Sequence, residues 1–167
     1  MKRPTRTPGN SEAEISLQRA IAGALIEALA FIPRVRSSLK PDDLFSAHVR
    51  TVYGELLATD DAGKPIDLPL VAAELQRHDV LEKIGGSSFV AELVNGVPAD
   101  PSLLDGWVAK DRENAIKRRT AKFGKTLAES ALNGLAPEQL AQMLQGAIED
   151  LKPAQAQNWR DLLREFL

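Results

Sequence analysis

The sequence predicts an all-α protein, with a compact helical head followed by an antiparallel helical hairpin. Three observations indicate this class. Apolar residues recur at spacings of three and four along most of the 167 residues, as they do on one face of a helix. No segment shows the sustained polar–apolar alternation with β-branched residues that is typical of a half-buried strand. Several prolines and glycines fall at the ends of the periodic stretches, where helices start and stop.

The head is expected to follow a flexible tail of residues 1–10, which is basic and contains two prolines. A first helix is expected from Ser11, and Pro33 should end or bend it, because proline lacks the backbone N–H that a helix interior needs. A second helix is expected to open at Pro41. Proline suits the first turn of a helix, and the two aspartates that follow favour its positive end.

Two further helices complete the head, which is expected to span residues 11–100. Asp67 has the side chain of a helix cap, because its carboxylate can accept a hydrogen bond from a backbone N–H of the first turn. Gly85 and Gly86 predict a tight turn, and a short helix that contains Phe89 should follow.

The hairpin is expected over residues 101–152, as one long helix to Leu132 and a second helix from Pro137. The pair Asn133-Gly134 supplies the stop between them, because both residue types tolerate the left-handed conformation that ends helices. Residues 153–167 are expected to form a linker and a short C-terminal helix.

Composition excludes several kinds of chemistry. The chain has no Cys, so disulfides, thiolate catalysis and Cys-ligated metal sites are excluded. Its two histidines, His48 and His78, are too far apart in sequence to form a helical metal pair. The formal net charge of -2 does not indicate a globally basic nucleic-acid binder. No apolar run approaches the ~20 residues that a bilayer demands, so we expect a cytoplasmic protein without membrane contact.

One short motif resembles part of a phosphate-binding loop. Gly124-Lys125-Thr126 matches the end of such a loop, but Arg119 stands where the loop requires its first glycine. The motif also lies inside a helical pattern, whereas phosphate binding needs free backbone amides after a strand. Ser87 and Ser88 have no nearby base to activate them. We therefore expect no catalytic residue, no cofactor and no metal site in this chain.

The second hairpin helix carries the most regular apolar stripe of the sequence. Together with two apolar residues of the preceding helix, this stripe forms the candidate protein interface: Phe123, Leu127, Leu140, Met143, Leu144, Ala147 and Ile148. Core packing within one hairpin and binding to another chain both account for the stripe, and the pattern alone leaves the two open.

The densest group of charges is a basic face on the long helix: Lys117, Arg118, Arg119, Lys122 and Lys125. Spacings of three, four and seven place several of these on one side of a helix. A solvated helix face is the simpler interpretation, and contact with DNA or an acidic partner is the functional one. Only Phe123 accompanies the cations, so stacking on single-stranded bases has little support.

A set of motifs in the middle of the chain carries a family resemblance. The central motifs are Gly63, Pro65, Ile66 and Asp67, then Leu81, Ile84, Gly85, Gly86, Phe89 and Leu93. Flanking matches are Gly23-Ala24-Leu25, Pro41-Asp42-Asp43, Val52-Tyr53, Pro98, Trp107, Glu113, Ala115 and Arg118. Over residues 16–120 the sequence resembles the N-terminal domain of DnaB-type replicative DNA helicases. The combination is what makes the likeness specific.

The resemblance implies a fold and a role. In that family the domain is a helical head with a helical hairpin, hairpins pair, and the heads form a collar of trimeric or hexameric symmetry. The collar takes part in docking the primase. The likeness also implies a RecA-like ATPase after the hairpin, and the sequence to Leu167 contains none. Early placement of Glu12-Ala13-Glu14 and displacement of His48 by one residue indicate a divergent member.

We therefore expect a non-catalytic module of DNA replication that self-associates, as a dimer to a hexamer, and docks a primase or a helicase loader. The alternative is a small accessory DNA-binding protein that uses the basic face. Salt-dependent DNA binding that weakens when Arg118 and Arg119 become Glu would distinguish the alternative.

Overall fold

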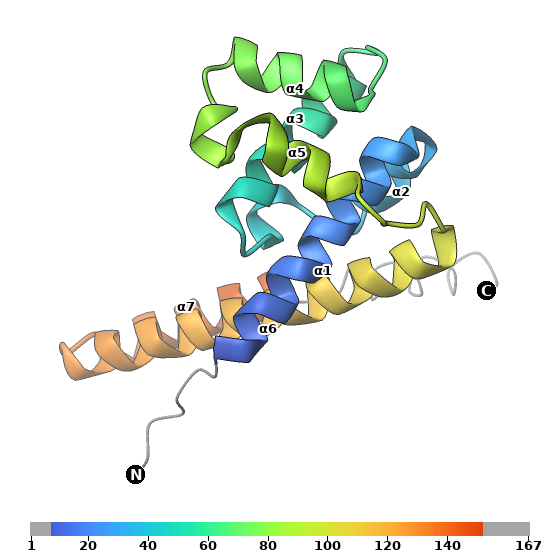
Figure 1. Cartoon of the computed structure of the whole chain (residues 1–167). Coiled ribbons are helices and arrows are strands. Elements are labelled where there is room, and N and C mark those ends of the chain that lie inside the picture. Colours follow the sequence, from blue (N-terminus) through green and yellow to red (C-terminus); the bar gives the residue numbers. More distant parts are fainter. Residues whose placement is uncertain (1–7, 152–167) are drawn as a thin grey trace. The chain divides into compact units, whose positions relative to one another are not determined.

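The computed structural model describes residues 8–151, and within this range the chain is helical with no strand (Figure 1). The all-α class is confirmed. The α-helices are α1 (Pro8–Glu27), α2 (Ile32–Arg36), α3 (Ala47–Asp61), α4 (Leu68–Arg77), α5 (Gly86–Val94), α6 (Pro101–Leu132) and α7 (Pro137–Leu151). Three short 3-10 turns lie between them: η1 (Leu29–Phe31), η2 (Pro41–Asp43) and η3 (Glu82–Ile84).

The chain divides into two compact units between Ala115 and Ile116, inside α6. The sequence-based division placed the boundary near residue 100, at the start of this helix. The head unit reaches further because Leu104 and Val108 on the first half of α6 belong to its apolar core. We call the first unit the head and the second, from Ile116, the hairpin.

The head is built around α1, which packs against α3 and α5 (Figure 1). Ile21 and Leu25 of α1 are at most 1% exposed, as are Leu56 of α3 and Leu93 of α5. Gly23 permits the approach of α1 to α5, because a Cβ atom built at this position would lie 1.9 Å from the carbonyl oxygen of Leu93. The head therefore has one well-packed core, with a glycine where α1 passes close to α5.

Two expectations for the start of the head are wrong. Helix α1 ends at Glu27 rather than at Pro33. Pro33 lies in the first turn of α2, where a helix does not need the backbone N–H that proline lacks. At the other end α1 begins at Pro8, inside the tail expected over 1–10; residues 1–7 lie outside the described range.

Pro41 does not open the second long helix. It begins the single turn η2, because the Lys40 N–H donates to Asp43 Oδ2 at 3.0 Å and the chain then becomes extended at Leu44. Helix α3 starts afterwards at Ala47, where the hydroxyl of Ser46 accepts from the next turn as the cap.

The remaining boundaries follow the sequence signals. Asp67 caps α4 by accepting from the backbone N–H of Leu70 at 2.8 Å. Gly85 and Gly86 have φ angles of 110° and 71°, in the left-handed region that favours glycine. Helix α6 spans the expected range, and α7 begins at Pro137 as predicted. The linker and short helix expected over 153–167 lie outside the described residues.

Candidate protein interface

The apolar stripe of α7 stays partly open to solvent. Leu144 is 43% exposed and Ile148 is 58% exposed, while Leu140, Met143 and Ala147 are half-buried. Burial of apolar surface contributes about 25 cal/mol per Å². A stripe of this regularity that remains exposed is therefore a favourable surface for another chain.

The facing part of the interface on α6 is also incompletely covered. Phe123 and Leu127 are half-buried, and Leu132 at the end of the helix is 88% exposed. Between Ile116 and Ile148, every side chain that the structure describes is at least partly exposed. All seven predicted interface residues thus lie on the hairpin, and none of them is buried within it.

Several small residues of the hairpin face open space. A Cβ atom added at Gly124 of α6 or at Gly146 of α7 would meet no atom within 4 Å. Ala128 and Ala131 present only methyl groups on the later part of α6, and both are exposed. The α6 sequence therefore offers little apolar area to the stripe of α7.

The predicted basic face is not uniform. Lys117, Arg119, Lys122 and Lys125 are exposed, whereas Arg118 is half-buried. The Lys125 Nζ atom lies 3.7 Å from a carboxylate oxygen of Glu129 one turn later, an exposed pair of small energetic value. The five residues therefore do not form one continuous solvent-facing row.

The motif that resembles a phosphate loop lies inside α6. Gly124-Lys125-Thr126 is helical, so its backbone amides belong to the hydrogen-bonding pattern of the helix. The Thr126 hydroxyl donates to the carbonyl oxygen of Lys122 at 3.2 Å. These amides cannot converge on a phosphate, and the motif is a coincidence of sequence.

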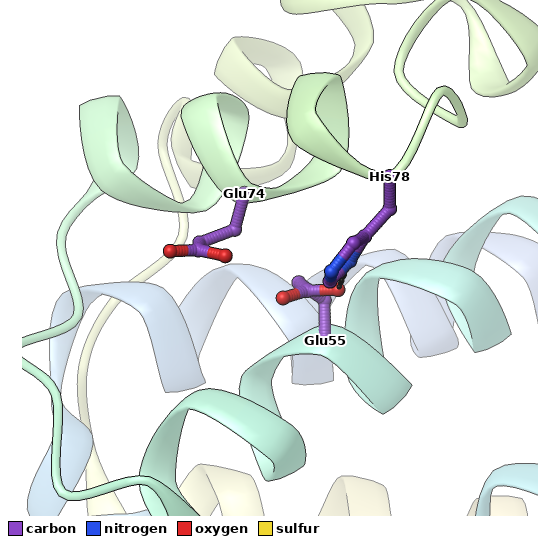
Figure 2. A group of neighbouring side chains, drawn as sticks. All are labelled: Glu55, Glu74 and His78. Atoms are coloured by element: carbon purple, nitrogen blue, oxygen red, sulfur yellow. Dashed lines mark hydrogen bonds and ion pairs between the residues drawn. The ribbon is translucent and has the colours of Figure 1, made fainter.

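His78 joins a cluster of ionisable side chains that the sequence did not reveal. It caps the C-terminus of α4, and its Nδ1 atom lies 2.9 Å from Glu55 Oε2 on α3 (Figure 2). Glu74, one turn before it, completes a set whose ligand-type atoms lie within 4.8 Å of one another. The spacing of Glu74 and His78 is a visible signal, but Glu55 comes from another helix and only the fold brings it near.

The carboxylate of Glu74 is already engaged. Lys64 Nζ lies 3.0 Å from one oxygen, and the Arg77 guanidinium donates to the other. The hydrogen bond from Arg77, followed by that from Lys64, lowers the pKa of Glu74 below its usual value. A divalent cation would have to compete with both cations. The cluster is best described as the ion pairs of Glu74 with Lys64 and Arg77, beside a contact of Glu55 on α3 with His78 at the end of α4.

His48, the second histidine, lies on the head surface. Its ring meets the ring of Phe89 edge to face, with centroids 5.6 Å apart, and the Arg19 guanidinium lies 5.1 Å from the same Phe89 centroid. His48 therefore has a packing role that links α3 to α5.

Inside the head, three elements meet at one polar contact. Gln18 and Asp111 are each 0% exposed, and Gln18 Nε2 donates to Asp111 Oδ1 at 2.6 Å. The backbone N–H of Ser46 donates to Gln18 Oε1 at 2.9 Å. One signal for this buried contact is present in the sequence: Asp111 lies at helical spacing from Val108 and Ala115, on the buried stripe of α6.

No helix within residues 8–151 combines the length and the apolar character needed to cross a bilayer. Residues 8–105 match the family model described as the DnaB-like helicase N terminal domain. That match covers most of the head.

Two curated bacterial proteins are similar over most of this chain. The replicative DNA helicase DnaC of Bacillus subtilis is 30% identical over 122 residues, which are 73% of this chain and 26% of that protein. The replicative DNA helicase DnaB of Geobacillus stearothermophilus is 29% identical over 116 residues, which are 69% of this chain and 25% of that protein. The chain thus spans about a quarter of the length of the relatives it matches.

A solved structure agrees in fold. The crystal structure of the N-terminal domain of DnaB helicase from Mycobacterium tuberculosis matches with a TM-score of 0.71 and 26% sequence identity. The match covers 81% of this chain and 96% of that one. The similarity therefore extends through almost the whole of the solved domain.

Proposed function

Because the chain belongs to the family of DnaB-like helicase N-terminal domains, we propose that it is a non-catalytic assembly module of DNA replication. It associates with further copies of itself, as a dimer to a hexamer, through the hairpin. It also docks another replication protein, a primase or a helicase loader, and it does so in the cytoplasm. The observation that carries the proposal is the apolar stripe of α7, where Leu144 and Ile148 are exposed in the described part of the chain.

The contrast with the head supports assignment of self-association to the hairpin. The head buries its apolar stripes against one another, so it gains its stability within one chain. The hairpin presents half-buried Leu140 and Met143 beside exposed Leu144 and Ile148, which a second hairpin of the same kind would cover. Two such faces are complementary because each is apolar and regularly spaced.

A change at the centre of the stripe tests the proposal. Leu144→Glu places a charge in the proposed contact, where its desolvation opposes association. We expect the mass of the chain, measured by sedimentation equilibrium, to fall from that of an oligomer to that of the monomer. Gln145→Glu is the matched control, because it adds the same charge at the next, exposed position of α7 and should leave the mass unchanged.

Two results would contradict the proposal. A monomeric wild-type chain at all accessible concentrations would remove self-association through the hairpin. A Leu144→Glu chain that keeps the mass of the wild-type oligomer would show that the contact lies on another surface. Circular dichroism of both variants shows whether the helices remain intact.

The second candidate is contact of the basic face with DNA. Lys117, Arg119, Lys122 and Lys125 are exposed, which is the observation that favours it. Charge reversal at Arg119 and Lys122 should weaken binding to a fluorescent duplex at low salt and reduce its salt dependence. Absence of binding by the wild-type chain at low salt would exclude this function.

A further inference from the structure

Asp111 is an acid inside the head that the proposed assembly function does not use. It is 0% exposed and lies on the face of α6 that also buries Leu104, Val108 and Ala115. A carboxylate at such a position loses its hydration, which is costly unless hydrogen bonds replace it. An apolar residue could occupy this buried position of α6 without that cost. The presence of an acid there therefore needs a physical reason.

The hydrogen bonding of Asp111 is only half complete. Its Oδ1 atom accepts from Gln18 Nε2 at 2.6 Å, whereas the buried Oδ2 atom has no hydrogen-bond partner. The orientation of the Gln18 amide is fixed, because its oxygen already accepts the backbone N–H of Ser46 at 2.9 Å. The amide therefore turns one N–H toward the acid and cannot serve the second oxygen as well.

The charges around Asp111 disfavour its ionised form. Asp43 on η2 is a second buried acid, 6% exposed, and its charge acts on Asp111. The basic side chains nearby along the same elements all reach solvent at least in part: Lys40, His48, Arg50, Lys110 and Arg112.

We propose that Asp111 is a proton-sensitive latch, which holds the first half of α6 on the head more firmly when it is protonated than when it is ionised. A neutral carboxyl group loses far less on burial than a carboxylate, and it still accepts the hydrogen bond from Gln18. The latch lies wholly within the head, so it is independent of self-association through the hairpin.

The direction of the pH effect follows from the titration of the acid. Burial raises the pKa of Asp111 to about 6, against the opposing hydrogen bond from Gln18 and with support from the charge of Asp43. An unfolded aspartate titrates near ~3.9. The folded head therefore holds a proton that the unfolded chain releases, and its stability rises through this group as the pH falls from about 7 to about 4.

Titration of the full-length chain by NMR tests the first step. The side-chain carboxyl carbon of Asp111 is assigned by its loss in Asp111→Asn, and its chemical shift is followed from pH 4 to pH 8. We expect a midpoint near 6. Gln18→Met removes the donor with little change of shape and should move the midpoint upward. A wild-type midpoint below about 5 would overturn the proposal.

Hydrogen exchange tests the second step, with rates corrected for the intrinsic effect of pH. At pH 7.5, amides of residues 104–115 should exchange about tenfold or more slowly in Asp111→Asn than in the wild type, and this difference should be smaller at pH 5.5 and vanish only at about pH 4, where the opened chain also takes up the proton. Asp105→Asn is the control on the same helix: it removes a carboxylate whose partner is the exposed Arg34, and its effect should lack this pH dependence.

Two results would overturn the proposal. One is a difference in exchange rate between the wild type and Asp111→Asn that is equally large at pH 7.5 and pH 5.5. The other is a wild-type chain that is less protected at pH 5.5 than at pH 7.5. If Asp111→Asn fails to fold, the NMR titration of the wild-type chain tests the proposal alone. The carboxyl resonance of Asp111 is then assigned as the one whose midpoint moves in Gln18→Met. Neither readout depends on the oligomeric state of the hairpin.

Discussion

The head and the hairpin use the same helical periodicity for different purposes. In the head, the apolar stripes meet one another, and Leu25 and Leu56 are 0% exposed. In the hairpin, the equally regular stripe of α7 leaves Leu144 at 43% and Ile148 at 58% exposed. Periodicity therefore predicts that a helix has an apolar face, but it does not say whether the same chain covers that face.

The comparison separates two sources of stability. The head gains its stability from burial within one chain, so changes in its core should act on folding at any protein concentration. The hairpin lacks a buried side chain among its described residues, so changes on its apolar face should act mainly on association. The following substitutions test this separation, from the largest expected effect to the smallest.

Truncation of one leucine in each unit gives the sharpest contrast. Leu56→Ala should lower the free energy of unfolding of the head by about 2 to 5 kcal/mol, because it leaves a cavity in the core. Leu144→Ala should change it by less than about 1 kcal/mol at concentrations where the chain is monomeric. Urea denaturation followed by circular dichroism measures both. Equal losses would mean that the two units do not differ in the way described here.

Two glycines of the head test how tightly its helices pack. Gly23→Ala should cost about 1 to 3 kcal/mol, because the new methyl group would overlap the Leu93 carbonyl oxygen. In contrast, Gly54→Ala in α3 meets no atom within 4 Å and should stabilise the head by about 0.5 to 1 kcal/mol. Chemical denaturation of the two variants compares them, and a Gly23→Ala chain as stable as Gly54→Ala would argue against the close contact of α1 with α5.

The ion pairs of Glu74 with Lys64 and Arg77 should contribute least. Glu74→Gln removes the partner of Lys64 and Arg77, and we expect a small decrease in Tm at pH 7, since both cationic side chains are exposed. Because the pKa of Glu74 is lowered, its contribution is present above about pH 4.5 and is lost as the pH falls below that range. A thermal melt at pH 7 and pH 3 checks this, and a difference that persists at pH 3 would contradict it.

Local signals predicted much of the fold. Asp67, Gly85 and Pro137 mark boundaries that the structure confirms, because caps, positive φ angles and first-turn prolines act within a few residues. The signals failed at Pro33 and Pro41. A proline is compatible with either the end or the start of a helix, and tertiary packing decides between the two.

The polar contacts of the head could not be predicted in the same way. Gln18 and Asp111 are 93 positions apart, and Glu55 and His78 come from different helices. Their meeting depends on the tertiary arrangement of α1, α3, α4 and α6, which sequence periodicity does not specify. The apolar residues of the hairpin were visible in the sequence, and the structure adds the degree to which each of them remains exposed.

Hydrogen exchange as a function of protein concentration tests the central claim most directly. If another copy of the chain covers the stripe of α7, amides of residues 138–148 should become more protected as the concentration rises, while those of α3 in the head stay constant. Leu144→Glu should abolish the concentration dependence. Protection of α7 that is independent of concentration in the wild type, or that rises equally in Leu144→Glu, would contradict assembly through the hairpin.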